Sequence, residues 1–220
     1  LVGVLVERVA YRPLRSAGRL APVISALGVA FILQSLARNV YGASWKTYPN
    51  VLKLGGRISI GGGASIAVMQ IVVLAISFAL MGALYLFIQR TRIGTAMRAV
   101  SLDHDVSRLM GIDVNRIIAI VFLIGPGLGG IAGVIVGVYY GSFDFTLGWV
   151  FGLKAFIAAI LGGIGNIPGA MLGGMILGII ETLGAGYLSP QWKDVLAYLI
   201  LIVILIFRPT GLLGERVAEK

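Results

Sequence analysis

The stretch IIAIVFLIGPGLGGIAGVIVGVYY, residues Ile117–Tyr140, decides the fold because it is long, apolar and free of charged residues. A helix needs roughly 20 predominantly apolar residues to cross the ~30 Å hydrocarbon core of a bilayer. A second run, Ala67–Ile88, is also uncharged and long enough. These two runs predict a chain that crosses a membrane more than once.

The composition of the whole chain agrees with a membrane protein. Of the 220 residues, 58% are hydrophobic and 12% are charged, with a mean hydropathy of +0.98. Soluble domains are about half apolar and about a quarter charged. The predicted fold class is therefore all-α: a polytopic transmembrane helical bundle forming one transmembrane domain over residues 1–220. The chain has no Cys, which excludes disulfides and thiolate metal sites within it.

Six spans are predicted after an apolar N-terminal stub, Leu1–Val6. They are Leu20–Ala37, Ala67–Ile88, Ile117–Tyr140, Trp149–Gly165, Ile167–Leu188 and Val195–Phe207. The fourth span carries Lys154 near one end, where a lysine can snorkel to the interface. The last span is short, and local thinning of the bilayer can accommodate it. Because the chain begins inside the stub without an initiator Met, we expect it to be N-terminally truncated, with further spans preceding it.

The distribution of Lys and Arg predicts the orientation of these spans. If Glu7–Arg19 is cytoplasmic, the cytoplasmic segments hold twelve basic residues and the outer segments hold four. The twelve are Arg8, Arg12, Arg15, Arg19, Arg90, Arg92, Arg98, Arg108, Arg116, Arg208, Arg216 and Lys220, and the four are Lys46, Lys53, Arg57 and Lys193. Loops on the cytoplasmic side carry the excess of Lys and Arg. The C-terminus is therefore predicted to be cytoplasmic, and the net charge of +9 reflects topology rather than nucleic-acid binding.

Small residues recur at helical spacing in two spans. The third span contains a glycine ladder of Gly125, Gly129, Gly133, Gly137 and Gly141, and the fifth contains Ala170, Gly174 and Gly178. Small residues four apart let a second helix approach closely in lipid. We interpret the ladder as a helix-packing surface within the chain, with a subunit interface or a pathway lining as the alternatives. Pro126 is expected to kink the third span.

Two further features of the spans are open to two interpretations each. The fourth and fifth spans are joined only at Asn166–Pro168, within GGIGNIPG, either as a tight helical hairpin, which we favour, or as two half-helices lining a pathway. Glu181 is the acid inside a clear span, so it should face protein or a water-filled cavity. It is a candidate pathway or ion-coupling residue, or else a structural carboxyl near the outer end.

The longest predicted cytoplasmic loop, Gln89–Arg116, contains a short amphipathic pattern. Val106, Leu109 and Met110 fall at i, i+3 and i+4, which places them on one face of a helix over Ala99–Gly111. Ser101 is a candidate N-cap and Gly111 a candidate C-terminal stop. A helix this short is not stable alone, so its apolar face needs a partner, either a membrane surface or another protein.

Motifs for catalysis are missing from the sequence. It contains no GxxxxGK[ST], no Cys or His cluster, no serine triad and no carboxylate pair, and the one His, His104, has no second ligand. We therefore predict no enzymatic activity, no metal and no cofactor of the chain's own. Energy for any pumping would come from another subunit.

Four stretches together carry a resemblance to a known family. They are ERVAYRPLR at Glu7–Arg15, GTAMRAVSLDHDVSRLMGI at Gly94–Ile112, LKAFIAAILGGIGNIPGAMLGG at Leu153–Gly174 and RPTGLLG at Arg208–Gly214. With them the whole chain resembles the permeases of branched-chain amino acid ABC transporters, and more closely the first of the two permeases that pair in such systems.

This resemblance implies a function and a set of partners. The chain would be an inner-membrane permease subunit for leucine, isoleucine and valine, working with a second permease, two ATP-binding subunits that use the ATP, and a periplasmic solute-binding protein. The loop over residues 90–116 would dock into the ATPase. The residues that match the docking motif, together with Leu109 of the apolar face, are Gly94, Arg98, Ala99, Asp103, Asp105, Leu109 and Gly111.

Other transport functions compete with this one. Related permeases carry urea, short amides or other small solutes, and no residue of the sequence directly identifies the substrate. An ion-coupled secondary transporter would need an intramembrane acid, for which Glu181 is the candidate.

Overall fold

A computed structural model describes residues 2–14, 21–48, 56–59, 65–187, 189–208 and 210–214. It divides the chain into two compact units, residues 1–147 and 148–220, and each is described by itself. Several positions named above lie outside the described residues, namely Leu1, Arg15, Arg19, Leu20, Lys53, Leu188, Pro209, Arg216 and Lys220.

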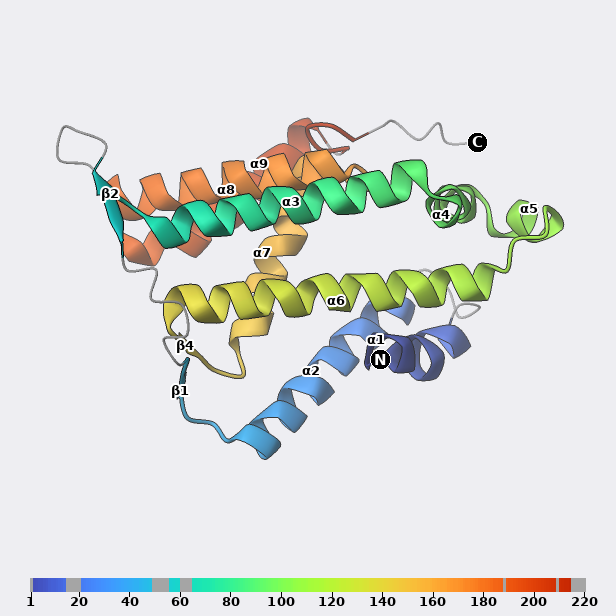
Figure 1. Ribbon diagram of the computed structural model, residues 1–220, viewed down its shortest axis with the longest axis horizontal. Coiled ribbons are helices and arrows are strands. Elements are labelled where there is room, and N and C mark those ends of the chain that lie inside the picture. Colours follow the sequence, from blue (N-terminus) through green and yellow to red (C-terminus); the bar gives the residue numbers. More distant parts are fainter. Residues whose placement is uncertain are drawn as a thin grey trace. The chain divides into compact units, whose positions relative to one another are not determined.

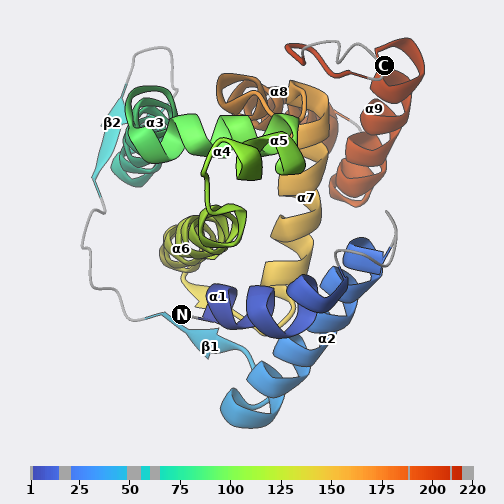
Figure 2. The same ribbon diagram turned by 90° about the vertical axis from the view of Figure 1, so that its right-hand side faces the viewer.

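Two of the long helices of the first unit run antiparallel to each other (Figure 1). These are α3 (Val68–Arg90) and α6 (Val114–Tyr140), and the Gln70 side-chain amide donates to the Tyr139 hydroxyl at 3.4 Å between them. Two short helices, α4 (Arg92–Leu102) and α5 (His104–Leu109), connect them. Figure 2 looks onto this connection, which lies across the ends of α3 and α6.

The N-terminal part of the first unit packs beside α6. α1 (Val2–Val6) continues as a π-helical turn over Glu7–Tyr11 and a 3₁₀ turn over Arg12–Leu14, and α2 (Ala21–Tyr41) follows. A Cβ on Gly3 would lie 2.0 Å from the Phe122 carbonyl oxygen, so only glycine allows α1 to come this close. That carbonyl is the one whose helical donor is missing at Pro126, and α6 remains one helix through the proline.

Short strands tie the predicted outer segments together. β1 (Lys46–Thr47) pairs antiparallel with β4 (Ser142–Phe143), and β2 (Arg57–Ser59) pairs with β3 (Ser65–Ala67). They sit at the ends of α2, α3 and α6.

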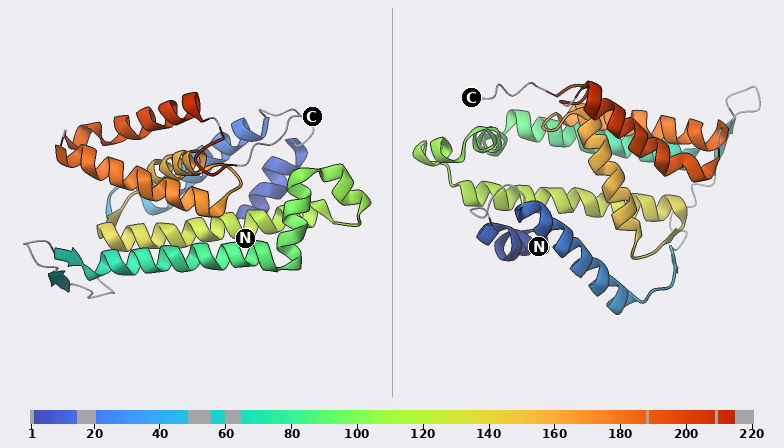
Figure 3. Two further views of the ribbon diagram at one scale, coloured as in Figure 1. Left: turned by 90° about the horizontal axis from the view of Figure 1, so that it is seen from above. Right: turned by 180° about the vertical axis from the view of Figure 1, so that it is seen from behind.

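The described residues of the second unit form three α-helices. They are α7 (Leu147–Gly162), α8 (Ile167–Tyr187) and α9 (Lys193–Phe207), with a 3₁₀ turn at Pro190–Trp192. α8 and α9 run antiparallel beside each other, and α7 crosses them (Figure 3). The buried core is formed by Ile157, Ala158, Leu177 and Ala197, with Leu201 packed against it.

The helices confirm the all-α transmembrane bundle. Within the residues that the structure describes, five are long and apolar enough to cross a membrane: Ile24–Tyr41, Val68–Arg90, Val114–Tyr140, Ile167–Tyr187 and Pro190–Phe207. The predicted fourth span corresponds to α7, which is apolar but has only 16 residues. Many large apolar side chains on these helices are exposed, which suits surfaces that face lipid or partner chains.

Candidate functional site

The connection between α3 and α6 is two helices rather than the one helix predicted over Ala99–Gly111. Asp103 breaks the chain with an extended backbone (φ −156°, ψ 121°) and caps α5 by accepting from the backbone N–H groups of Asp105 and Val106 at 2.8 and 3.0 Å. These bonds favour the carboxylate and hold the pKa of Asp103 below its ordinary value. The predicted cap, Ser101, is wrong, because its hydroxyl donates to the Arg98 carbonyl inside α4.

The predicted C-terminal stop at Gly111 is confirmed. Gly111 has a φ of +80°, and its N–H bonds to the Arg108 carbonyl at 3.0 Å. The N–H of Ile112 bonds to the Ser107 carbonyl at 3.0 Å. This pair of bonds is a Schellman motif, in which a left-handed glycine ends the helix. Asp103 and Gly111, which both belong to the stretch Gly94–Ile112, therefore define the two ends of α5.

One side of the α4–α5 connection is anchored to α6. Val100 of α4 is buried against Val114 and Ile117 of α6, with Ala96, Met97, Ile112 and Ile118 packed around them. Ser107 of α5 is buried as well. The short helices thus have a fixed base on the longest helix of the unit.

The other side of the connection carries an exposed apolar surface. The side chains of Leu102, Val106, Leu109 and Met110 are 87%, 55%, 86% and 77% exposed. We call these four residues the apolar knob. Three of them are the predicted stripe, although Met110 follows α5 rather than belonging to it. Large apolar side chains gathered on a protruding polar helix pair suit contact with another protein.

The remaining residues of the predicted docking set have distinct places. A Cβ on Gly94 would lie 2.1 Å from the Ile88 carbonyl oxygen, so this glycine permits the sharp corner between α3 and α4. Arg98 donates to the Gln89 side-chain amide across that corner. Ala99 is half-buried on α4, and exposed Asp105 lies 3.4 Å from the Arg108 guanidinium. Gly94 and Arg98 therefore shape the corner, and α5 carries the exposed groups.

A second site is a charged cluster within the apolar helices of the second unit. The Lys154 ammonium lies 2.8 Å from Oε1 of Glu181 and 3.0 Å from Oδ1 of Asp194. Lys193 lies 3.6 Å from Oε2 of Glu181. One lysine of α7 thereby joins an acid on α8 to an acid at the start of α9.

Glu181 is the most buried member of this charged cluster, with its side chain 9% exposed against 20% for Lys154. Within the described part of the chain, Oε1 of Glu181 accepts no hydrogen bond. The charge of the nearby Lys154 ammonium therefore compensates the negative charge of this oxygen. A buried carboxylate without a compensating cation would be strongly unfavourable. Glu181 is therefore half of an ion pair, and Lys154 turns toward carboxylates instead of only snorkelling outward.

The buried face of α8 differs by one residue from the predicted stripe. Gly169, Gly173, Leu177, Glu181 and Gly184 are buried, whereas Gly174 and Gly178 are exposed. A Cβ on Gly173 would lie 2.2 Å from the Ala158 carbonyl oxygen. The backbone contact with α7 is made by this neighbouring row of glycines rather than by Ala170, Gly174 and Gly178, whose role as a subunit interface or pathway lining stays a prediction.

The corner between α7 and α8 matches neither predicted arrangement fully: α8 is a full-length helix of 21 residues rather than a half-helix, but α7 crosses α8 instead of lying alongside it as in a hairpin. Only residues 163–166 separate the two helices, and Gly163 and Gly165 have φ of +108° and +94°.

The C-terminal segment folds onto this corner. The backbone N–H groups of Leu212 and Leu213 donate to the carbonyls of Leu161 and Gly162, and the Asn166 side chain donates to the Leu213 carbonyl at 2.9 Å.

The glycine ladder of α6 is open over most of its length. In the described part of the chain, no atom outside α6 lies within 4 Å of a Cβ built on Gly125, Gly129 or Gly133. Gly137 is buried against the Tyr48 ring, and Gly141 ends the helix with a φ of +68°. Packing of a second helix on this surface stays a prediction.

Sequence reasoning missed the pairing of Lys154 with Glu181, although the signal was present. Two opposite charges in neighbouring apolar spans are expected to meet, because each is unfavourable alone.

His104 is exposed at the first turn of α5, and no three His, Asp or Glu side chains gather as metal ligands within the described residues.

Comparison with known proteins identifies the relatives of this chain. The model of a family described as "Branched-chain amino acid transport system / permease component" matches residues 1–205. The high-affinity branched-chain amino acid transport system permease protein BraD of Pseudomonas aeruginosa is 45% identical over 99% of this chain and 72% of its own length. The corresponding protein LivH of Escherichia coli K12 is 43% identical over 98% and 70%. The fructose import permease protein FruG of Bifidobacterium longum is 25% identical over 85% and 58%. No solved structure matches.

Proposed function

Because the chain belongs to the family of permease components of branched-chain amino acid transport systems, we propose that it is the membrane subunit through which leucine, isoleucine and valine cross the inner membrane. Relatives named for these amino acids match nearly the whole chain at 42–45% identity, whereas the fructose permease matches at 25%. This difference favours branched-chain amino acids over sugars, urea or short amides.

The apolar knob is the observation that supports a partner ATPase. It presents Leu102, Val106, Leu109 and Met110 on helices whose base is buried against α6. Burying a side chain of this kind stabilises a contact by roughly 1.5–3 kcal/mol before ordering costs. A knob on a rigid base transmits displacement to α6, which is what coupling to ATP hydrolysis requires. The chain's partners would be a second permease, two ATP-binding subunits and a periplasmic solute-binding protein.

The charged cluster supports a place for Glu181 beside the transport route. Asp194 and Lys193 are 64% and 40% exposed, so the cluster runs from the protein interior to the surface. It lies at the end of α8 and the start of α9, which the charge distribution assigns to the outer side. The ion pairs with Lys154 and Lys193 give Glu181 a structural role, and this disfavours ion-coupled transport.

Uptake in proteoliposomes tests the proposal. The chain is reconstituted with its second permease and ATP-binding subunits, and radiolabelled leucine is supplied with the binding protein. We expect leucine uptake that requires ATP and continues when a protonophore abolishes the proton gradient. Uptake driven by a gradient without the ATPase would support a secondary transporter, and uptake of urea in place of leucine would reassign the substrate.

A further inference from the structure

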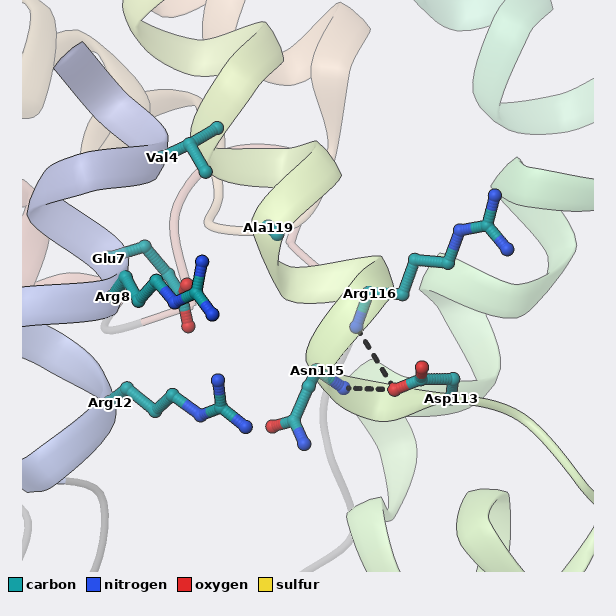
Figure 4. A pocket seen from close by; sticks show the side chains of 8 residues that line it. All are labelled: Val4, Glu7, Arg8, Arg12, Asp113, Asn115, Arg116 and Ala119. Atoms are coloured by element: carbon teal, nitrogen blue, oxygen red, sulfur yellow. Dashed lines mark hydrogen bonds between the residues drawn. The ribbon is translucent and has the colours of Figure 1, made fainter. Parts of the chain in front are cut away.

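The first unit contains a cavity that the transport function does not use. It has a volume of about 330 Å³ and lies between the N-terminal helical segment and the first turns of α6. Its lining residues are Val4, Glu7, Arg8, Arg12, Asp113, Asn115, Arg116 and Ala119 (Figure 4).

Two guanidinium groups point into this cavity from one side. Figure 4 shows Arg8 and Arg12 extending from the N-terminal segment toward the first turn of α6, while the Arg116 side chain extends the other way. Neither the Arg8 nor the Arg12 side chain makes a hydrogen bond or ion pair within the residues that the structure describes. Two guanidinium groups directed at one space form a site for an oxyanion, because each presents several N–H donors in a plane.

The cavity favours an anion, because the guanidinium groups of Arg8 and Arg12 both point into it. The Asp113 carboxylate is already engaged, since its Oδ1 accepts from the backbone N–H groups of Asn115 and Arg116 at 3.1 Å each. A phosphodiester carries one negative charge and oxygens that match the guanidinium donors.

The position of the cavity points to a lipid. It lies where α6 begins, at the end of a membrane-spanning helix, on the side that the charge distribution assigns to the cytoplasm. The same N-terminal segment exposes Val2, Leu5 and Val9 at 60%, 64% and 68%, which suits contact with acyl chains. We propose that this cavity binds the phosphodiester headgroup of an anionic phospholipid through Arg8 and Arg12.

Lipid binding to the complete transporter in detergent tests the site. Wild type, the double variant Arg8→Gln/Arg12→Gln and the control Arg90→Gln/Arg92→Gln are titrated with phosphatidylglycerol, phosphatidylcholine and inorganic phosphate. Binding is followed by native mass spectrometry and by the midpoint of thermal unfolding. The control removes the same charge from exposed arginines near the same predicted face.

We expect phosphatidylglycerol to bind and to raise the midpoint of the wild type and of the control. The Arg8→Gln/Arg12→Gln variant should bind it about 30-fold more weakly, at roughly fivefold per basic residue near an anionic surface. Equal binding to all three proteins would overturn the site. A full effect from inorganic phosphate would overturn the lipid assignment and leave a soluble phosphate ligand. Unchanged lipid binding with loss of the ATP-binding subunits would make this a protein contact.

Discussion

The ammonium of Lys154 on α7 lies 2.8 Å from a carboxylate oxygen of Glu181 on α8. The residues directly before and after each of these two in the sequence are apolar or small. The two residues are 27 positions apart in the sequence, and the Gly-rich corner at residues 163–166 brings their helices together. Asp194 extends the pair to α9. Each helix of the second unit therefore contributes a charge to one cluster.

Removing one member of this pair should destabilise the second unit. Lys154→Met removes the nearest cation from the buried Glu181 carboxylate, and we expect a loss of about 3 kcal/mol, the lower end for breaking a buried ion pair. Lys193→Met is the matched control, because Lys193 is 3.6 Å from Glu181 and 40% exposed, so its loss should cost less than about 1 kcal/mol. Thermal unfolding in detergent measures both. Equal losses would mean that Lys154 is not the principal partner.

The corner between α7 and α8 should depend on two glycines to different degrees. Gly163 and Gly165 both have positive φ, but a Cβ on Gly163 would lie 2.4 Å from the Gly214 nitrogen, whereas Gly165 faces open space. Gly165→Ala should cost about 1–2 kcal/mol through backbone strain alone. Gly163→Ala should cost more and release the C-terminal segment.

The rate of limited proteolysis after Phe207 measures the release of the C-terminal segment, and thermal unfolding gives the stability of each variant. If Gly163→Ala and Gly165→Ala behaved alike in both measurements, the contact between the corner and residues 210–214 would contribute nothing.

Leu109→Asp should abolish leucine uptake and weaken co-purification of the ATP-binding subunits. Leu109 is 86% exposed, so the change does not disturb the fold, but it places a carboxylate in the apolar knob. His104→Asp is the control, since it adds the same charge to the same exposed helix without removing an apolar side chain. Normal co-purification and transport by Leu109→Asp would move the coupling contact to another segment.

The orientation of the chain can be measured in intact cells with single cysteines, because these 220 residues contain no Cys. A cysteine at Ser101, on α4, should be protected from an impermeant thiol reagent added outside. A cysteine at Tyr187, at the far end of α8 and 87% exposed, should be labelled. The reverse pattern would invert the topology.

The glycine ladder should matter for assembly rather than for the stability of the chain alone. A Cβ on Gly133 has no described atom outside α6 within 4 Å, so we expect the unfolding midpoint of Gly133→Leu to match that of Val121→Leu. If the second permease packs on this surface, Gly133→Leu should reduce its co-purification, because a leucine separates two backbones in contact. Gly137→Leu should instead lower the midpoint, since Tyr48 occupies that space. Undiminished assembly by Gly133→Leu would remove the ladder from the interface.

The sequence by itself determined the membrane-spanning helices, their approximate ends and the stop at Gly111. These features depend on local properties: apolar length and the ability of glycine to adopt positive φ. The same local rules misplaced the cap of α5, because Ser101 and Asp103 are both good caps and only the extended backbone at Asp103 distinguishes them.

The tertiary structure decided which side chains meet. The sequence shows Lys154 and Glu181 in different spans, but their pairing depends on how α7 crosses α8. The choice between two neighbouring glycine rows on α8 likewise depends on which row faces the Ala158 carbonyl. The convergence of Arg8 and Arg12 on the first turn of α6 depends on the close approach at Gly3. Contacts between distant segments are set by packing geometry, and a single sequence carries no direct record of it.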